Sequence, residues 1–134
     1  MIVQMYVGNK ISKLRGTVLE IDMEAASNLL ELVLFNKPVK YLRAYTPDEG
    51  IKLAETEHPD VILLEPFMPV SGFEIYETLQ SNQNTKYIPV IFYNKRKPEI
   101  ETKLKKLGVP YIYKPIDFDE LFKYLATYLT VVED

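Results

Sequence analysis

Residues 61–74, VILLEPFMPVSGFE, decide the fold of this chain. The four consecutive apolar residues 61–64 are typical of a strand that is buried on both faces. This strand ends on a carboxylate, Glu65, and a proline-rich bend follows it. Ser71 and Glu74 then have the spacing of a capping box, which predicts the start of a helix. A buried strand followed by a bend and a helix is the building unit of a parallel α/β sheet.

The remainder of the chain repeats this unit. Strands are predicted at residues 17–21, 39–45, 61–65, 87–93 and 110–113, and helices at residues 24–37, 47–57, 72–81, 98–108 and 118–129. Five repeats of strand then helix predict a doubly wound, five-stranded parallel sheet with helices on both faces. We expect the most apolar strands, 61–64 and 88–93, to be central. Capping patterns support helix starts after Thr46 and Asp117 and a helix end at Gly108.

Composition narrows the class of protein. The 134 residues include 47% hydrophobic side chains and carry a formal net charge of −3, which suits one globular domain and argues against a broad nucleic-acid-binding face. The absence of cysteine excludes a disulfide framework and a thiolate metal site. No apolar stretch approaches the roughly 18 residues of a membrane span, and the N-terminus lacks a signal-peptide pattern. We therefore expect a cytoplasmic protein.

The first 16 residues lie outside the strand–helix alternation. Gly8 and Asn9 suit a tight turn, so residues 1–16 are predicted as an N-terminal extension that forms a β-hairpin. A disordered lead or a partner-binding strand is the alternative. The predicted organisation is this extension, one domain at residues 17–130 and a C-terminal tail at residues 131–134.

Candidate site residues follow from the sheet. Ligands of a parallel α/β sheet bind beyond the carboxyl ends of its strands. The residues at those ends are Asp22, Met23, Glu65, Asn94, Lys95 and Lys114. No glycine-rich loop follows the first strand, which argues against a flavodoxin-like binder of small molecules. The single histidine, His58, precedes a proline in a polar turn and has no partner motif for acid–base catalysis.

Five segments together resemble one known family. They are VLEIDME (18–24), PDVILLEPFMP (59–69), SGFE (71–74), IPVIFYN (88–94) and GVPYIYKP (108–115). In order and spacing, residues 17 to 130 resemble a response-regulator receiver domain of two-component signalling. The resemblance implies a flavodoxin-like receiver fold, with an aspartate that accepts a phosphoryl group after the third strand and an acidic pair after the first strand that helps to hold Mg²⁺. It also implies a Ser or Thr after the fourth strand and a Lys after the fifth, both contacting phosphoryl oxygens.

Part of that set is present. Asp22 matches the first acidic position, Lys114-Pro115 matches a Lys-Pro pair whose peptide bond is commonly cis, and Tyr111 matches the switch aromatic. Met68-Pro69 also falls at the expected distance after the acceptor position. Asp22 is interpreted either as a helix cap or as a metal ligand.

The departures lie in the pocket itself. Glu65 stands at the acceptor position, Met23 replaces the second acidic residue, Asn94 replaces the Ser or Thr, and Lys95 replaces a small residue. The loop between Pro69 and Gly72 is one residue shorter than the common pattern. A thioether is a poor Mg²⁺ ligand. We therefore predict a pseudo-receiver that is not phosphorylated, is not an enzyme and needs no cofactor. The alternative is an active receiver that accepts a phosphoryl group with Mg²⁺.

Glu65 leads to a specific hypothesis. It is one methylene longer than aspartate, a gain in reach of roughly 1.5 Å. We expect its carboxylate to form a standing ion pair with Lys114, with Lys95 as a candidate second cation. The alternative is a structural carboxylate that accepts hydrogen bonds from loop N–H groups.

The last two strands and the final helix are rich in tyrosine. The tyrosines in or near them are Tyr87, Tyr93, Tyr111, Tyr113, Tyr124 and Tyr128. Tyrosine is favoured at protein interfaces, and the resemblance implies partner contacts on this face. We expect a homodimer or a contact with a signalling or effector protein there; ordinary packing is the alternative. No membrane or nucleic-acid partner is expected.

Overall fold

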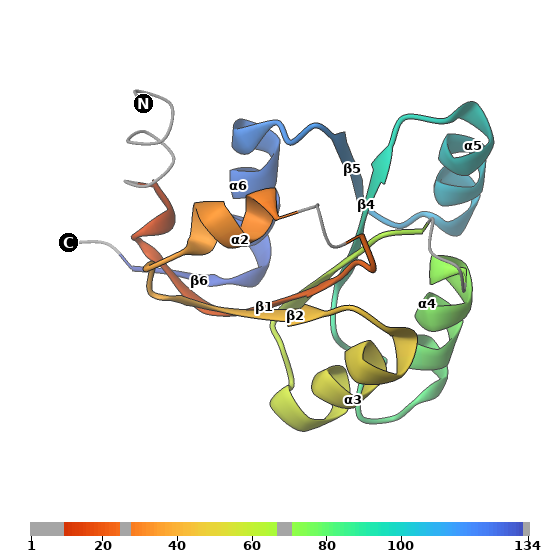
Figure 1. The fold of residues 1–134 in the computed structure, drawn as a ribbon, viewed down its shortest axis with the longest axis horizontal. Coiled ribbons are helices and arrows are strands. Elements are labelled where there is room, and N and C mark those ends of the chain that lie inside the picture. The colour runs from red at the N-terminus through yellow and green to blue at the C-terminus, as the bar shows by residue number, and fades with distance from the viewer. Residues whose placement is uncertain (1–9, 25–27, 67–70, 133–134) are drawn as a thin grey trace.

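The computed structural model describes residues 10–24, 28–66 and 71–132. Its strands are β1 (Leu14–Ile21), β2 (Val39–Ala44), β3 (Val61–Leu64), β4 (Val90–Lys95), β5 (Tyr111–Lys114) and β6 (Thr130–Val131). Its helices are α2 (Leu29–Leu34), α3 (Pro47–Glu57), α4 (Gly72–Ser81), α5 (Pro98–Leu107) and α6 (Phe118–Tyr128). Strands and helices alternate as the sequence predicts, and Figure 1 shows the resulting arrangement.

The five strands β1 to β5 form a parallel sheet in the order β2-β1-β3-β4-β5. Strand β3, which begins the stretch 61–74, is the central strand, and its four residues are all buried. On one side Ile62 aligns with Leu19 of β1, and on the other side it aligns with Val90 of β4. The predicted doubly wound parallel sheet and its central strands are confirmed.

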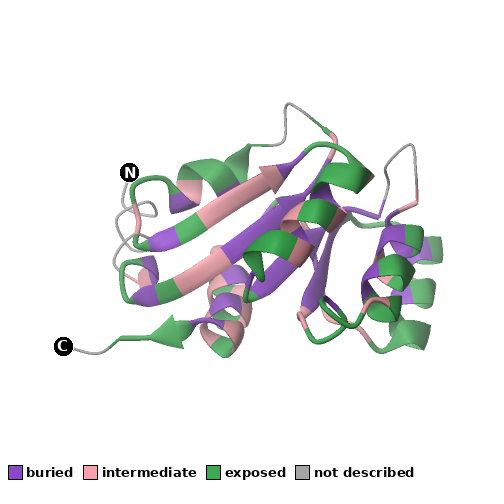
Figure 2. Cartoon of the chain, turned by 90° about the horizontal axis from the view of Figure 1, so that it is seen from below, coloured by how far each residue is buried: buried purple, intermediate pink, exposed green. Residues whose placement is uncertain are grey.

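Helices cover both faces of the sheet (Figure 1). On one face, α2 and α6 pack on a cluster of buried residues that includes Leu30, Leu63 and Leu121. On the other face, α3, α4 and α5 pack on a cluster that includes Leu64 and Phe92. Figure 2 shows the buried residues concentrated on the inner strands and on the helix sides turned toward the sheet. Side chains alternate between the faces along each strand, so alternate residues of β1 and β3 belong to different clusters.

The predicted helix ends are present. The Thr46 hydroxyl accepts the Glu49 N–H at 3.2 Å, and the Asp117 carboxylate accepts the N–H groups of Asp119 and Glu120. Ser71 accepts the Phe73 N–H at 3.2 Å. Gly108 has a left-handed backbone conformation with a φ of 68°, where glycine avoids the strain that a side chain would add.

The start of the domain differs from the prediction. The predicted hairpin turn at Gly8 and Asn9 lies outside the described residues, whereas residues 10–13 form a helical turn closed by a bond from the Lys13 N–H to the Lys10 carbonyl. The first strand begins at Leu14 rather than at residue 17. Its start pairs with the antiparallel β6, with Leu14 opposite Val131. Ile11 and Leu14 are buried in the cluster under α2 and α6, so these residues belong to the packed domain.

The second predicted element is shorter than expected. A helix was predicted at residues 24–37, but α2 spans Leu29–Leu34, and residues 25–27 lie outside the described part. Asn36 has a φ of 56°, a left-handed conformation in which a helix cannot continue. Among the described helices, none is long and apolar enough to cross a lipid bilayer.

Candidate functional site

Three charged side chains meet beyond the carboxyl ends of the parallel strands. Asp22 follows β1, Glu65 follows β3 and Lys114 ends β5. All three alternate in phase with buried residues of the α2 and α6 cluster, such as Val18, and therefore lie on that face of the sheet. The strand-end residues that the sequence predicts are thus brought together by the strand order.

Lys114 forms two ion pairs at once. Its Nζ lies 2.9 Å from Oε2 of Glu65 and 2.9 Å from Oδ2 of Asp22. The exposed fractions of the side chains are 11% for Lys114, 8% for Glu65 and 1% for Asp22, so water screens these contacts weakly. The predicted contact between Glu65 and Lys114 is present. The bond from Lys114 to Asp22 is an addition that the sequence prediction did not include.

Lys114 is held in its ionised form. Burial disfavours the charged ammonium, but the hydrogen bonds to Glu65 and Asp22 outweigh burial and raise the pKa of Lys114 above its ordinary value. The Nζ also lies 4.7 Å from the ring centre of Tyr93. Burial and the neighbouring carboxylates of Glu20, Asp22 and Glu65 raise the pKa of Tyr93, so its phenol remains neutral beside the cation.

Asp22 also orders the loop that follows β1. Its Oδ1 accepts the Glu24 N–H at 2.9 Å, a local turn closed by the side chain. The described helix α2 starts only at Leu29, so this bond caps the loop and not α2. Met23 is half-buried and packs against the cluster on the opposite face of the sheet. Its thioether therefore fills space, as a methionine at the edge of a core commonly does.

Asn94 and Lys95 differ in their roles. Asn94 is buried, its Nδ2 donates to the Lys95 carbonyl at 2.9 Å, and its Oδ1 has no hydrogen-bond partner among the described residues. Lys95 is exposed, and the described residues include no ion pair between it and Glu65. Lys95 is therefore not the second cation beside Glu65, and its side chain is in solvent instead. The Lys114–Pro115 peptide bond is cis, as the resemblance implies.

The site offers Mg²⁺ two carboxylates, and both already bond a cation. Mg²⁺ takes oxygen ligands in octahedral geometry, usually including one or two carboxylates. Asp22 and Glu65 already share the ammonium of Lys114, and Met23 offers only sulfur on the other face. In residues 10–24, 28–66 and 71–132, no group of three acidic or imidazole side chains is arranged to hold a metal ion.

Sequence reasoning missed a second ionic group beside the first. Glu20 lies within β1 and is 1% exposed. Its Oε1 accepts the Tyr41 hydroxyl at 2.6 Å and lies 3.4 Å from Nη1 of Arg43. Burial raises the pKa of Glu20, although the bond from Tyr41 and the charge of Arg43 oppose that shift. The signal in the sequence was a glutamate inside an apolar strand, with Tyr41 and Arg43 two residues apart in the neighbouring strand.

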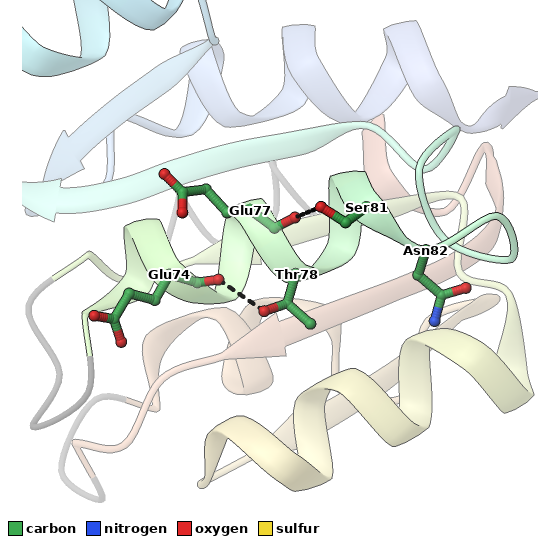
Figure 3. A pocket seen from close by; sticks show the side chains of 5 residues that line it. All are labelled: Glu74, Glu77, Thr78, Ser81 and Asn82. Atoms are coloured by element: carbon green, nitrogen blue, oxygen red, sulfur yellow. Dashed lines mark hydrogen bonds between the residues drawn. The ribbon is translucent and has the colours of Figure 1, made fainter.

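A polar surface groove on α4 is separate from the site at the strand ends. Glu74, Glu77, Thr78, Ser81 and Asn82 line it (Figure 3). The Thr78 hydroxyl donates to the Glu74 carbonyl at 3.0 Å, and the Ser81 hydroxyl donates to the Glu77 carbonyl at 2.8 Å. Both hydroxyls therefore bond to their own helix, and the groove contributes no group to the site at the strand ends.

Comparisons with known proteins agree with this architecture. The family description of the response regulator receiver domain matches residues 21–126. The chain is 34% identical over 85 residues to protein PilH of Pseudomonas aeruginosa, which covers 61% of this chain and 70% of PilH. It is 28% identical over 113 residues to the polar-differentiation response regulator DivK of Brucella ovis, covering 82% of this chain and 89% of DivK.

Solved structures share the fold. The chemotaxis protein CheY4 of Vibrio cholerae superposes with a TM-score of 0.73 at 24% identity, covering 86% of this chain and 99% of that one. The receiver domain of the sensor histidine kinase PA1611 of Pseudomonas aeruginosa, which has a magnesium ion in its active-site cleft, superposes with a TM-score of 0.74 at 18% identity, covering 85% and 97%. From its family match and its fold, this chain belongs to the response-regulator receiver-domain family.

Proposed function

We propose that this chain is a pseudo-receiver, which signals through protein–protein contacts and does not accept a phosphoryl group at Glu65. The observation that carries the proposal is the position of Lys114 Nζ, 2.9 Å from both Glu65 and Asp22. In this arrangement a built-in cation continuously offsets part of the negative charge of the two carboxylates. The domain would then keep one pocket state without metal, cofactor or catalysis.

The chemistry of phosphoryl transfer supports this proposal. Such a transfer depends on positioning and on cations that offset the charge of the transferred group. Here the acceptor position carries a longer carboxylate, Glu65, bonded to the lysine that would otherwise be available to the phosphoryl oxygens. Asn94 stands where the family has a Ser or Thr hydroxyl, and its side chain donates to a main-chain carbonyl.

A titration with beryllofluoride and Mg²⁺ tests the proposal. We expect amide resonances of Asn94, Lys95, Tyr111 and Lys114 to remain unchanged when the purified chain is mixed with both reagents. The matched control is the Met23→Asp/Glu65→Asp variant, which supplies carboxylates of the length that the family uses. The resonance shifts of this variant show how large a response to expect from a competent pocket. The unmodified chain should show no such shifts.

The opposite result would identify an active receiver. A small phosphodonor with Mg²⁺ would then add the mass of one phosphoryl group to the intact chain, and Glu65→Gln would abolish the addition. That pair of results overturns the proposal, because it assigns phospho-acceptance to Glu65.

We also propose that partners contact the face formed by β4, β5 and α6. Tyr111, Tyr113, Tyr124 and Tyr128 are half-buried there, which leaves part of each ring available to a partner. Tyr87 precedes β4 and is 80% exposed. Tyr93 is not part of this surface, because it is buried against the sheet and contacts Lys114.

A groove at the amino ends of β4 and β5 supports this choice of surface. It is lined by Tyr76, Gln80, residues 86–90, residues 107–110 and Tyr128. Leu107 at its edge is exposed, and exposed apolar side chains beside a groove favour a protein partner. We expect sedimentation equilibrium to detect a dimer that Tyr87→Ser weakens. A strict monomer at high concentration would remove the homodimer and leave only a heterologous partner.

A further inference from the structure

Arg43 bonds the main chain of the loop that follows β1. Its side chain is 6% exposed. The Nε and Nη2 atoms donate to the Asp22 carbonyl at 3.2 and 2.9 Å, and Nη2 also donates to the Glu24 carbonyl at 3.0 Å. One guanidinium therefore ties two carbonyls of this loop to β2. The guanidinium carries five N–H donors in one rigid plane, so a single side chain can bond both carbonyls at once.

Side chains of β1 and β2 hold the guanidinium of Arg43 in place. Its Nη1 lies 3.4 Å from Oε1 of Glu20, which aligns with Arg43 in the parallel pairing of β1 and β2. The Tyr41 hydroxyl donates to the same Oε1 at 2.6 Å. The Arg43 Cζ also lies 4.6 Å from the ring centre of Tyr45. These contacts fix the plane of the guanidinium.

Arg43 and Lys114 hold Asp22 from two sides. Arg43 bonds its carbonyl, whereas Lys114 bonds its carboxylate at 2.9 Å. A chain of polar contacts thus runs from Glu20 through Arg43, Asp22 and Lys114 to Glu65, in which Arg43 bonds the carbonyl of Asp22 and the other links are ion pairs. It spans β2, β1 and β5 and the residue that follows β3. Both cations contact Asp22, which matches the first acidic position of the family pattern.

We propose that Arg43 is a positioning residue, an internal cation that fixes the loop after β1 and holds Asp22 on Lys114. It orders this loop by hydrogen bonding, beside a pocket in which Met23 replaces the second acidic residue of the family pattern. This inference rests on the proposed function, because it explains how a pocket without metal keeps its shape. It predicts that Arg43 also opposes the return of a metal site.

Amide hydrogen exchange of the loop tests the positioning role. Glu20→Gln removes the buried carboxylate but keeps the guanidinium, and Glu20→Gln/Arg43→Gln removes both charges, so neither leaves Glu20 buried without a cation. Between these variants we expect exchange of the Glu24 N–H to accelerate roughly tenfold, about the effect of one lost hydrogen bond on local opening. Equal exchange in the two variants would overturn the inference.

Two further variants keep this test decisive. Arg15 also bonds main-chain carbonyls, those of Ser12 and Leu14, but lies far from the pocket in the sheet register, so Arg15→Gln should leave the Glu24 N–H unaffected. Should the double variant not fold, Arg43→Lys keeps the charge but loses the planar fork. We expect faster loop exchange in Arg43→Lys with an unchanged circular dichroism spectrum. Exchange at the unmodified rate would overturn the proposal.

A metal titration tests the second consequence. Mg²⁺ is titrated into Met23→Asp/Glu65→Asp carrying Glu20→Gln and into the same variant with Arg43→Gln added, and binding is followed by calorimetry. We expect about tenfold tighter binding when Arg43 is removed, because a positive charge beside Asp22 repels a second cation there. Equal affinities would contradict the inference alone. Mg²⁺ binding by the unmodified chain would instead contradict the proposed function, so the two failures are distinguishable.

Discussion

At the scale of single residues, Lys114 offsets part of the charge of two buried carboxylates. Replacing it with glutamine would remove the ammonium that bonds both Asp22 and Glu65. Removing one partner of a buried pair commonly costs about 3–5 kcal/mol. We expect Lys114→Gln to lower the free energy of unfolding by about that amount, measured by urea denaturation with an unchanged m-value.

Lys40→Gln is the matched control for this prediction. Lys40 also forms an ion pair, with Glu57, but both side chains are largely exposed. Exposed pairs contribute little, because water and salt screen them. We expect its denaturation midpoint to stay close to that of the unmodified chain. Similar midpoints for Lys114→Gln and Lys40→Gln would show that the buried pairs contribute no more than a surface pair.

Glu20 predicts a pH dependence of stability. Its pKa is raised above the ordinary 4.5 in the folded chain, mainly by burial. The folded state therefore binds this proton more tightly than the unfolded state, and the resulting stabilisation is complete below pH 4.5 and is lost as the pH rises through the folded pKa. We expect the stability of Glu20→Gln, relative to the unmodified chain, to increase between pH 4 and pH 7. A constant difference in urea midpoints across this range would contradict the prediction.

At the scale of elements, the close approach of α4 to the end of β3 positions Glu65. A Cβ added to Gly72 would lie 2.5 Å from the Glu65 carbonyl oxygen and 2.6 Å from Pro66 Cα, and main-chain atoms cannot move aside cheaply. We expect Gly72→Ala to cost about 1–3 kcal/mol, the usual range for overpacking. The resonances of Lys114 should shift as well, because Glu65 is displaced.

Gly108→Ala separates backbone strain from this steric effect. Gly108 has a positive φ, but no atom would lie within 4 Å of an added Cβ. Its substitution should cost about 1 kcal/mol through the backbone alone and leave the Lys114 resonances in place. Shifts of equal size in both variants would show that the approach of α4 does not position the pocket.

Local patterns predicted most of the elements, whereas contacts between strands were harder to predict. Apolar runs and caps such as Thr46 depend on neighbours in the sequence, so β3, α3 and α4 lie where the sequence places them. The pair of Glu65 and Lys114 could be predicted because family resemblance placed both at strand ends. Glu20 and Arg43 could not, because their pairing depends on the register of β1 against β2. The interruption at Asn36 depends on its backbone conformation, which composition does not reveal.

At the scale of the whole molecule, residues 10–16 are part of the fold. Leu14 is fully buried in the cluster beneath α2 and α6, at the point where β1 meets β6. We expect Leu14→Ala to cost about 2–5 kcal/mol, as for other buried leucines. Val131→Ala alters the partly exposed residue opposite Leu14, and it should change the unfolding free energy by less than about 0.5 kcal/mol. If Leu14→Ala and Val131→Ala had equally small effects in urea denaturation, the predicted domain start at residue 17 would be correct.

The bond between Lys114 and Asp22 has a consequence for folding kinetics. The two residues are 92 positions apart, and β3 and β4 lie between their strands. Contacts of such long sequence separation require most of the sheet to be assembled first. A contact that is absent from the transition state slows unfolding and leaves the folding rate nearly unchanged. The ionic pocket would therefore determine how long each folded molecule persists, and not how quickly it forms.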